Sequence, residues 1–146
     1  DVSKASDVEE LAQKTLQTFG AVHLWCNNAG VGVIRSAWET TLADWEWVIG
    51  VDLWSVVYGA RTFIPRMIAG GQPGYIVNTA SIAGVMTGFS PAYDASKHGV
   101  VALSEDLFNT MRLRGLGWDV DNNGELEKNG GWGANCERTT DHPSFQ

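Results

Sequence analysis

The sequence predicts an α/β fold built on a parallel sheet. Its segments alternate in the order helix, strand, helix, strand, helix, and the two strand-like runs are short and apolar. This alternation is typical of parallel strands joined by right-handed crossovers. A chain of 146 residues with 44% hydrophobic residues is long enough for one modest domain with a buried core.

The first helix is predicted from a capping-box pattern at Ser6–Glu9. Apolar residues follow at helical spacing, and Gly20 is expected to end the helix. The run Val22–Cys26 is short and apolar, which is typical of a strand buried on both faces. In that setting Cys26 is expected to be a small buried residue. The segment Asn27–Gly30 then ends the strand.

The second helix is predicted over Thr41–Met67, and its first residues again match a capping-box pattern. Pro65 is expected to kink or shorten it. After a glycine-rich turn, Tyr75–Ser81 is predicted to be the second buried strand. Ser90 and Pro91 look like the N-cap and the first residue of a third helix.

From Gly115 the character of the chain changes. Segment 115–146 is acidic and rich in Gly and Asn, so we expect an irregular or disordered tail behind a domain of residues 1–114. The opening of a calcium-binding loop is matched by Asp119, Asp121, Asn123, Gly124 and Leu126. The closing glutamate position holds Gly130 instead, so a solvated tail is favoured and calcium binding is the alternative.

Composition argues against several classes of partner. The net charge of −7 does not favour a nucleic-acid backbone or an anionic membrane surface. No apolar run approaches the roughly 18 residues of a membrane span, and no signal peptide is visible. Cys26 and Cys136 lie far apart in unlike settings, so we expect no disulfide framework and a reducing, cytoplasmic location. The three histidines show no ligand spacing, so no metal site is expected.

A catalytic constellation is predicted around Tyr93 and Lys97. These residues are four apart, one helical turn, so they project from the same helix face. An ammonium favours the phenolate form of a neighbouring phenol, which makes the pair an acid/base catalyst. Asn28 and Ser81 follow the two predicted strands, and the carboxyl ends of parallel strands border one ligand crevice.

These residues resemble the short-chain dehydrogenase/reductase family in its compact single-domain form. Asn27–Gly30 is similar to the family's NNAG motif, and Ser81, Tyr93 and Lys97 have the spacing of its Ser, Tyr and Lys. The resemblance runs from Asp1 to about Gly117. It implies a Rossmann-type fold, a doubly wound parallel sheet in three α/β/α layers, of which this chain holds a part.

The resemblance also implies a reaction and roles. The reaction is NAD- or NADP-linked interconversion of a small-molecule alcohol and a carbonyl. Tyr93 would exchange the proton of the substrate oxygen, Ser81 would hydrogen-bond that oxygen, and Lys97 would bind the nicotinamide ribose. The cofactor cleft would be lined by Asp1, Val2, Asn28, Ala29, Gly30, Tyr93 and Lys97. The helices that begin at Thr41 and Pro91 imply a homodimer or homotetramer for the complete protein.

The chain departs from the family pattern in ways that matter for function. Asp52 stands where the family has a catalytic asparagine, so a negative charge is added near Lys97. The glycine-rich phosphate loop and the residue that selects NAD or NADP would precede Asp1. We therefore expect a fragment that binds cofactor weakly and is inactive alone. A non-catalytic binding or interaction module with the same fold is the alternative.

Overall fold

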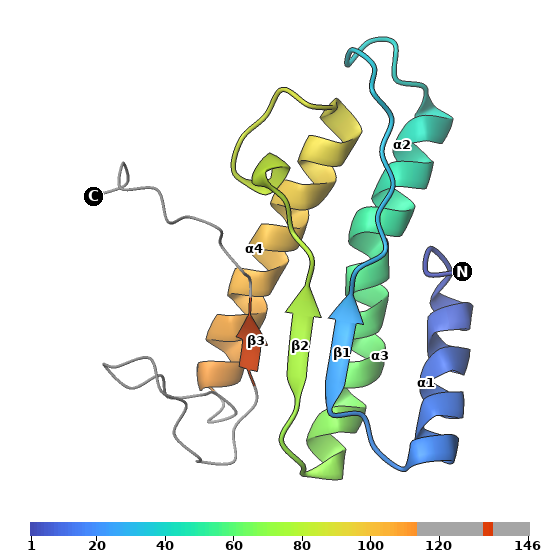
Figure 1. Cartoon of the computed structure of the whole chain (residues 1–146), viewed down its shortest axis with the longest axis vertical. Helices are drawn as coiled ribbons and strands as arrows, with labels where there is room; N and C mark the ends of the chain where they lie inside the picture. Colours follow the sequence, from blue (N-terminus) through green and yellow to red (C-terminus); the bar gives the residue numbers. More distant parts are fainter. Residues whose placement is uncertain (114–132, 136–146) are drawn as a thin grey trace.

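The computed structural model describes residues 1–113 and 133–135, with parallel strands in front and long helices behind them (Figure 1). In chain order the elements are α1 (Ala5–Phe19), β1 (Leu24–Asn27), α2 (Leu42–Ile49), the π-helical segment η1 (Gly50–Trp54), α3 (Ser55–Gly70), β2 (Tyr75–Asn78), the 3-10 helix η2 (Ile82–Gly84), α4 (Pro91–Leu113) and β3 (Gly133–Asn135). The expected alternation of helices and strands is confirmed.

The sheet has the order β1-β2-β3, and both pairings are parallel. Leu24 pairs with Tyr75, so the register brings the ends of β1 and β2 to the same level. The third strand was not expected, because it lies in the segment predicted to be irregular. β3 has three residues and no apolar pattern in its sequence. It is defined by its pairing with β2, in which Tyr75 is the register partner of Gly133. The calcium-loop pattern lies outside the described residues.

The described helices pack on one face of the sheet. Trp25 and Ile76 are register partners and share that face, where the Trp25 ring stacks on Phe63 of α3 at 5.1 Å between centroids. The core cluster consists of Val8, Ala12, Phe63, Met67, Ile76 and Met111. It therefore joins α1, α3 and α4 to the sheet.

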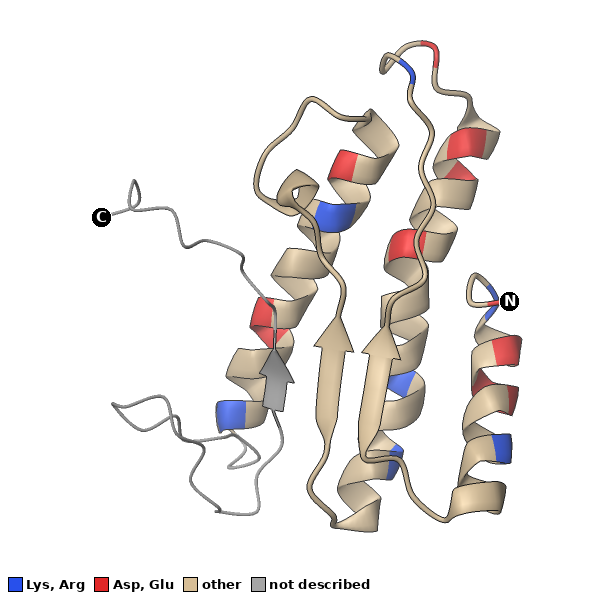
Figure 2. Cartoon of the chain, viewed as in Figure 1, with Lys and Arg blue, Asp and Glu red and all other residues tan. Residues whose placement is uncertain are grey.

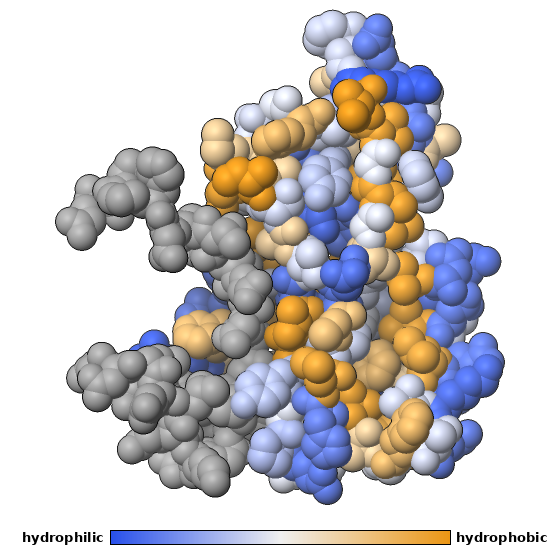
Figure 3. All heavy atoms as spheres, viewed as in Figure 1, coloured by the Kyte–Doolittle hydropathy of each residue, from blue (hydrophilic) through white to orange (hydrophobic). Residues whose placement is uncertain are grey.

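The other face of the sheet corrects an expectation. Leu24 is 60% exposed and Cys26 is exposed, so β1 is not buried on both faces. In residues 1–113 and 133–135 no helix covers this face, and the chain thus shows two of the three layers expected. Figure 3 shows apolar side chains on the side turned toward the viewer. Figure 2 shows that β1 and β2 carry no charged residue, as expected of strands that belong inside a domain.

The helix termini follow local chemistry with one exception. The predicted capping box at Ser6 is wrong, because α1 begins at Ala5 and the Ser6 hydroxyl hydrogen-bonds Asp7 instead. Gly20 ends α1 as predicted, in the left-handed conformation at φ 77°. Thr41 caps α2 as predicted, since its hydroxyl accepts from Asp44 N at 3.1 Å and its own N–H donates to the Asp44 carboxylate.

The second predicted helix is continuous but not uniform. η1 inserts π-helical geometry between α2 and α3. Pro65 lies inside α3, which continues to Gly70, so it does not shorten the helix. α4 begins at Pro91 as predicted. Among the helices of residues 1–113, none combines the length and apolar character needed to cross a bilayer.

Candidate active site

The two strands β1 and β2 end beside each other and are tied together there. Beyond the ladder, Thr79 N donates to the Asn27 carbonyl at 2.9 Å. The Thr79 hydroxyl donates to Asn28 Oδ1, also at 2.9 Å. These bonds hold the Asn28–Gly30 turn against the segment that leads to Ser81.

Lys97 of α4 reaches into this junction with its side chain 5% exposed. Its Nζ donates to the Thr79 carbonyl at 3.0 Å. The same Nζ lies over the Tyr93 ring, 5.5 Å from the centroid, because the two residues are one turn apart on α4. A Cβ on Gly84 would lie 2.8 Å from the Lys97 carbonyl, so only glycine lets η2 approach α4 this closely.

Asp52 lies in η1 with its side chain fully buried. Its Oδ1 accepts from Val31 N at 2.8 Å, and its Oδ2 lies 3.7 Å from Lys97 Nζ. Within the described residues, Oδ2 has no hydrogen-bond partner. Burial raises the pKa of Asp52, while the Val31 N–H and the Lys97 ammonium act in the opposite direction.

Close packing of η1 on α4 sets the distance between these charges. A Cβ on Gly99 would lie 3.0 Å from both methyl groups of Leu53, so a larger residue there would have to displace that side chain. A Cβ on Gly30 would lie 3.6 Å from Asp52 Oδ2 and 3.7 Å from Lys97 Nζ. The turn after β1 therefore passes directly over the Asp52–Lys97 pair.

The structure brings some predicted site residues together and leaves others apart. Asp52, Tyr93, Lys97 and Gly30 form one cluster. Ser81 is half-buried and is the N-cap of η2, the short helix that ends at Gly84. Its Oγ accepts a hydrogen bond from Ala83 N at 3.2 Å.

The remaining predicted cofactor residues are more peripheral. Asn28 and Ala29 are exposed, and Asn28 bonds to Thr79. Asp1 and Val2 precede α1 and line a hollow with residues of that helix, and none of the lining residues belongs to the Lys97 cluster.

Sequence reasoning missed two polar anchors of the site. Thr79 binds Lys97 through its main-chain carbonyl, and a carbonyl contact leaves no signal in residue type. Asp94 is buried, and its carboxylate accepts from the N–H groups of Gly88, Phe89 and Ser90 at 2.8–3.3 Å. The sequence did contain a signal for Asp94, because a carboxylate in the first turn of a helix commonly accepts hydrogen bonds from main-chain N–H groups at the helix start.

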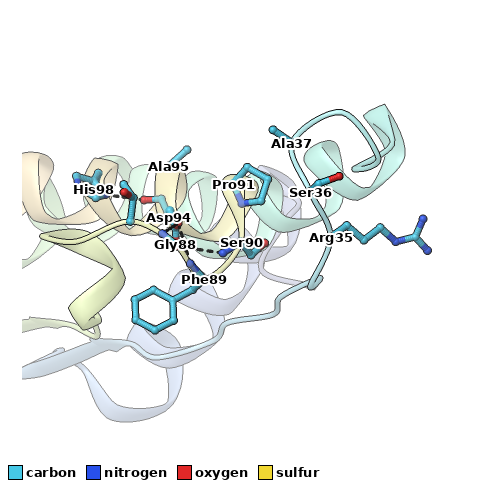
Figure 4. A pocket seen from close by; sticks show the side chains of 11 residues that line it. Arg35, Ser36, Ala37, Gly88, Phe89, Ser90, Pro91, Asp94, Ala95 and His98 are labelled. Carbon is cyan, nitrogen blue, oxygen red and sulfur yellow. Dashed lines mark hydrogen bonds between the residues drawn. The ribbon is translucent and has the colours of Figure 1, made fainter.

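An open cavity of about 580 Å³ lies beside this anchor (Figure 4). It is lined by the segments 35–37 and 87–91 and by Asp94, Ala95 and His98. Asp94 comes directly after Tyr93, and His98 comes directly after Lys97. One residue along a helix is a rotation of about 100°, so Asp94 and His98 lie on a different face of α4 from the predicted catalytic pair. In Figure 4 the Arg35 side chain extends away from the other lining residues. The cavity is therefore separate from the Tyr93–Lys97 cluster.

The cluster offers the donor set that a ribose and an adjacent carbonyl compound require. An ammonium and a phenol project from α4. The Ser81 hydroxyl follows on the segment after β2, which Thr79 joins to the turn after β1. Sugar hydroxyls accept from an ammonium, and a substrate oxygen accepts from phenol and serine hydroxyls. The residues present thus fit the nicotinamide–ribose part of a dinucleotide.

The sequence and structure match known proteins over most of the chain. The family profile described as short chain dehydrogenase matches residues 1–117. The "CLA biosynthesis dehydrogenase/reductase" of Lactiplantibacillus plantarum is 38% identical over 106 residues, which is 72% of this chain and 37% of that protein. The "Cyclohexanol dehydrogenase" of Acinetobacter sp. (strain SE19) is 39% identical over 108 residues, 72% of this chain and 42% of that protein.

A solved structure shares both fold and sequence. It is a short chain dehydrogenase/reductase from Burkholderia phymatum in complex with NAD, with a TM-score of 0.77 and 44% identity. The match covers 78% of this chain and 41% of the solved one. This chain therefore spans about two fifths of the length of these relatives.

Proposed function

Because this chain belongs to the short-chain dehydrogenase family, we propose that it carries the proton-transfer centre of an NAD(P)-dependent oxidoreductase. The proposed reaction interconverts an alcohol and a carbonyl. One observation carries the proposal: the Lys97 ammonium lies over the Tyr93 ring, at the end of two parallel strands.

Tyr93 is the proposed acid/base. A buried ammonium beside a phenol stabilises the phenolate, which can then take a proton from a substrate hydroxyl at Tyr93 Oη and return it in the reverse direction. The hydrogen bond from Lys97 Nζ to the Thr79 carbonyl fixes the ammonium in this position. Tyr93 is only half-buried, so a substrate can reach it.

Ser81 is the proposed second contact to the substrate oxygen. Its Oγ accepts from Ala83 N, which orients the hydroxyl and allows its own hydrogen to be donated to that oxygen. Lys97, with the Asn28–Gly30 turn, would hold the nicotinamide ribose. NAD or NADP, when bound, supplies or accepts the hydride. The NAD complex of the Burkholderia phymatum relative supports this choice of cofactor.

A chimaera tests the proposal. Residues 1–113 would replace the matching segment of the Acinetobacter cyclohexanol dehydrogenase, and oxidation of cyclohexanol would be followed by the absorbance of the reduced cofactor. We expect activity in the chimaera and a fall in kcat of about 10²–10⁴-fold in Tyr93→Phe. Tyr58→Phe is the matched control, because Tyr58 stacks on Trp54 away from the site.

The same experiment separates the alternative of a non-catalytic binding module. The Asp52 carboxylate beside Lys97 favours this alternative, since it offsets the charge that stabilises a phenolate. A folded chimaera that binds reduced cofactor without hydride transfer would refute the catalytic proposal and support the binding module.

Self-association of the complete protein is also proposed. Trp47 and Trp54 are 51% and 48% exposed on the helical layer, and both are large apolar side chains. A second copy packing on α2–α3 would bury them in a homodimer or homotetramer. Light scattering of the chimaera and of its Trp54→Glu variant measures this, and equal masses for both would count against this surface.

A further inference from the structure

We propose that Asp52 and Lys97 form a buried proton-binding pair whose net charge controls the ionisation of Tyr93. Asp52 exchanges one proton, and the Tyr93 phenol ionises more readily while Asp52 holds it. The inference deepens the proposed function at the same site. Its tests need neither cofactor nor substrate, so they can fail independently of that function.

The pair is buried but incompletely hydrogen-bonded. The Asp52 and Lys97 side chains are 0% and 5% exposed. The separation of 3.7 Å between Asp52 Oδ2 and Lys97 Nζ is too long for a hydrogen bond. Oδ1 receives one N–H, from Val31, and no described residue bonds to Oδ2. Burial without a full set of hydrogen bonds therefore costs an ionised carboxylate much solvation free energy, and it costs a protonated carboxyl less.

The groups that face Asp52 come from two elements, α4 and the turn after β1. Lys97 of α4 is the charged neighbour, and Tyr93 lies beyond it under the same ammonium. The turn after β1 contributes uncharged groups only, the Val31 N–H and the Gly30 main chain. One carboxyl, one amine and one phenol thus make up the titrating set of this cluster.

The net charge of the Asp52–Lys97 pair depends on whether Asp52 carries a proton. With Asp52 ionised, carboxylate and ammonium cancel, and Tyr93 meets little net charge. When Oδ2 gains a proton from solvent, the ammonium is no longer compensated, and it stabilises the phenolate more strongly. An asparagine at position 52 would leave the ammonium permanently uncompensated. Burial, which raises the pKa of Asp52, brings this exchange closer to neutral pH.

The first test is a carbon-13 NMR titration of the side-chain carboxyls in the 146-residue chain, with the Asp52 signal assigned through its bonded correlations to its own backbone amide, which needs no variant. We expect the Asp52 midpoint to lie at higher pH than that of Asp44, whose pKa is lowered by its capping bonds to Thr41. A midpoint for Asp52 equal to or below that of Asp44 would overturn the proposal.

The second test measures the phenol. Tyrosinate absorbance would be titrated in the chain and in Asp52→Asn, and the signal of Tyr93 isolated by subtracting the matching Tyr93→Phe variants. We expect the Tyr93 tyrosinate signal to appear at lower pH in Asp52→Asn than in the unaltered chain. Asp44→Asn is the control and should leave the titration in place. An unchanged Tyr93 titration in folded Asp52→Asn overturns the coupling; if Asp52→Asn does not fold, the carboxyl titration decides.

Discussion

Asn78 of β2 donates from Nδ2 to the Ser104 hydroxyl of α4 at 2.8 Å, with both residues at least 96% buried. Asn78 also accepts from Asn27 Nδ2 at 2.7 Å, and Ser104 donates to the Val100 carbonyl at 2.7 Å. This chain of bonds fixes α4 to the ends of both strands. It therefore sets where Lys97 and Tyr93, about two and three turns earlier on the same helix, lie over the sheet.

Ser104→Ala should destabilise the fold. It leaves Asn78 Nδ2 buried without its acceptor, and an unsatisfied buried donor costs about 1–3 kcal/mol. Urea unfolding followed by circular dichroism measures the loss. Thr110→Ala, on the exposed side of α4, is the matched control and should change the free energy of unfolding by less than about 0.5 kcal/mol.

Gly59→Ala should have a larger effect. A Cβ at this position would lie 1.6 Å from the Trp25 ring, so either the ring leaves its stack on Phe63 or α3 moves away from β1. We expect a loss of about 3 kcal/mol in the free energy of unfolding. Gly70→Ala in the same helix meets nothing within 4 Å and should be neutral or slightly stabilising. A Gly59→Ala variant as stable as Gly70→Ala would contradict this packing.

Thr41→Ala and Ser6→Ala should differ, although the sequence gives both residues the same capping pattern. Thr41 receives the Asp44 N–H, and its removal should cost about 1 kcal/mol. Ser6 lies inside α1 and caps nothing, so Ser6→Ala should leave the unfolding midpoint unchanged. Equal losses in the two variants would mean that α1 begins later than Ala5.

The stability of the chain should depend on pH through Asp52. Since burial raises the pKa of Asp52 in the folded state above the ordinary aspartate value of 3.8, the folded state binds this proton more tightly than the unfolded state. The stabilising contribution is complete below that value and is lost as pH rises through the folded pKa. Relative to Asp52→Asn, the wild-type chain should therefore lose stability as pH rises from about 4, by about 1.4 kcal/mol per unit of pKa separation.

Urea unfolding of both proteins across this pH range provides the measurement. A stability difference that grows in favour of the wild-type chain with rising pH would show that the Lys97 ammonium outweighs the cost of burial.

The helices were predictable because their signals are local. Thr41, Pro91 and Gly20 act on their own turns, and the spacing of Tyr93 and Lys97 places both on one face wherever the helix packs. Apart from the capping box at Ser6, the errors in burial and in strand number arose where a distant segment decides the outcome. The exposure of Cys26 depends on what covers the sheet, and β3 depends on an available strand edge.

The sequence by itself determined the alternation of elements and placed an amine beside a phenol, because residue spacing along a helix fixes direction. Only the tertiary structure decided that Asp52 would be buried 3.7 Å from Lys97 with one oxygen unbonded among the described residues. That outcome depends on π-helical geometry at η1 and on the close approach of Leu53 to Gly99. Contacts between segments remote in sequence set the distance from Asp52 to Lys97 and remove water from around both side chains. The loss of water changes the affinity of a buried carboxyl for a proton.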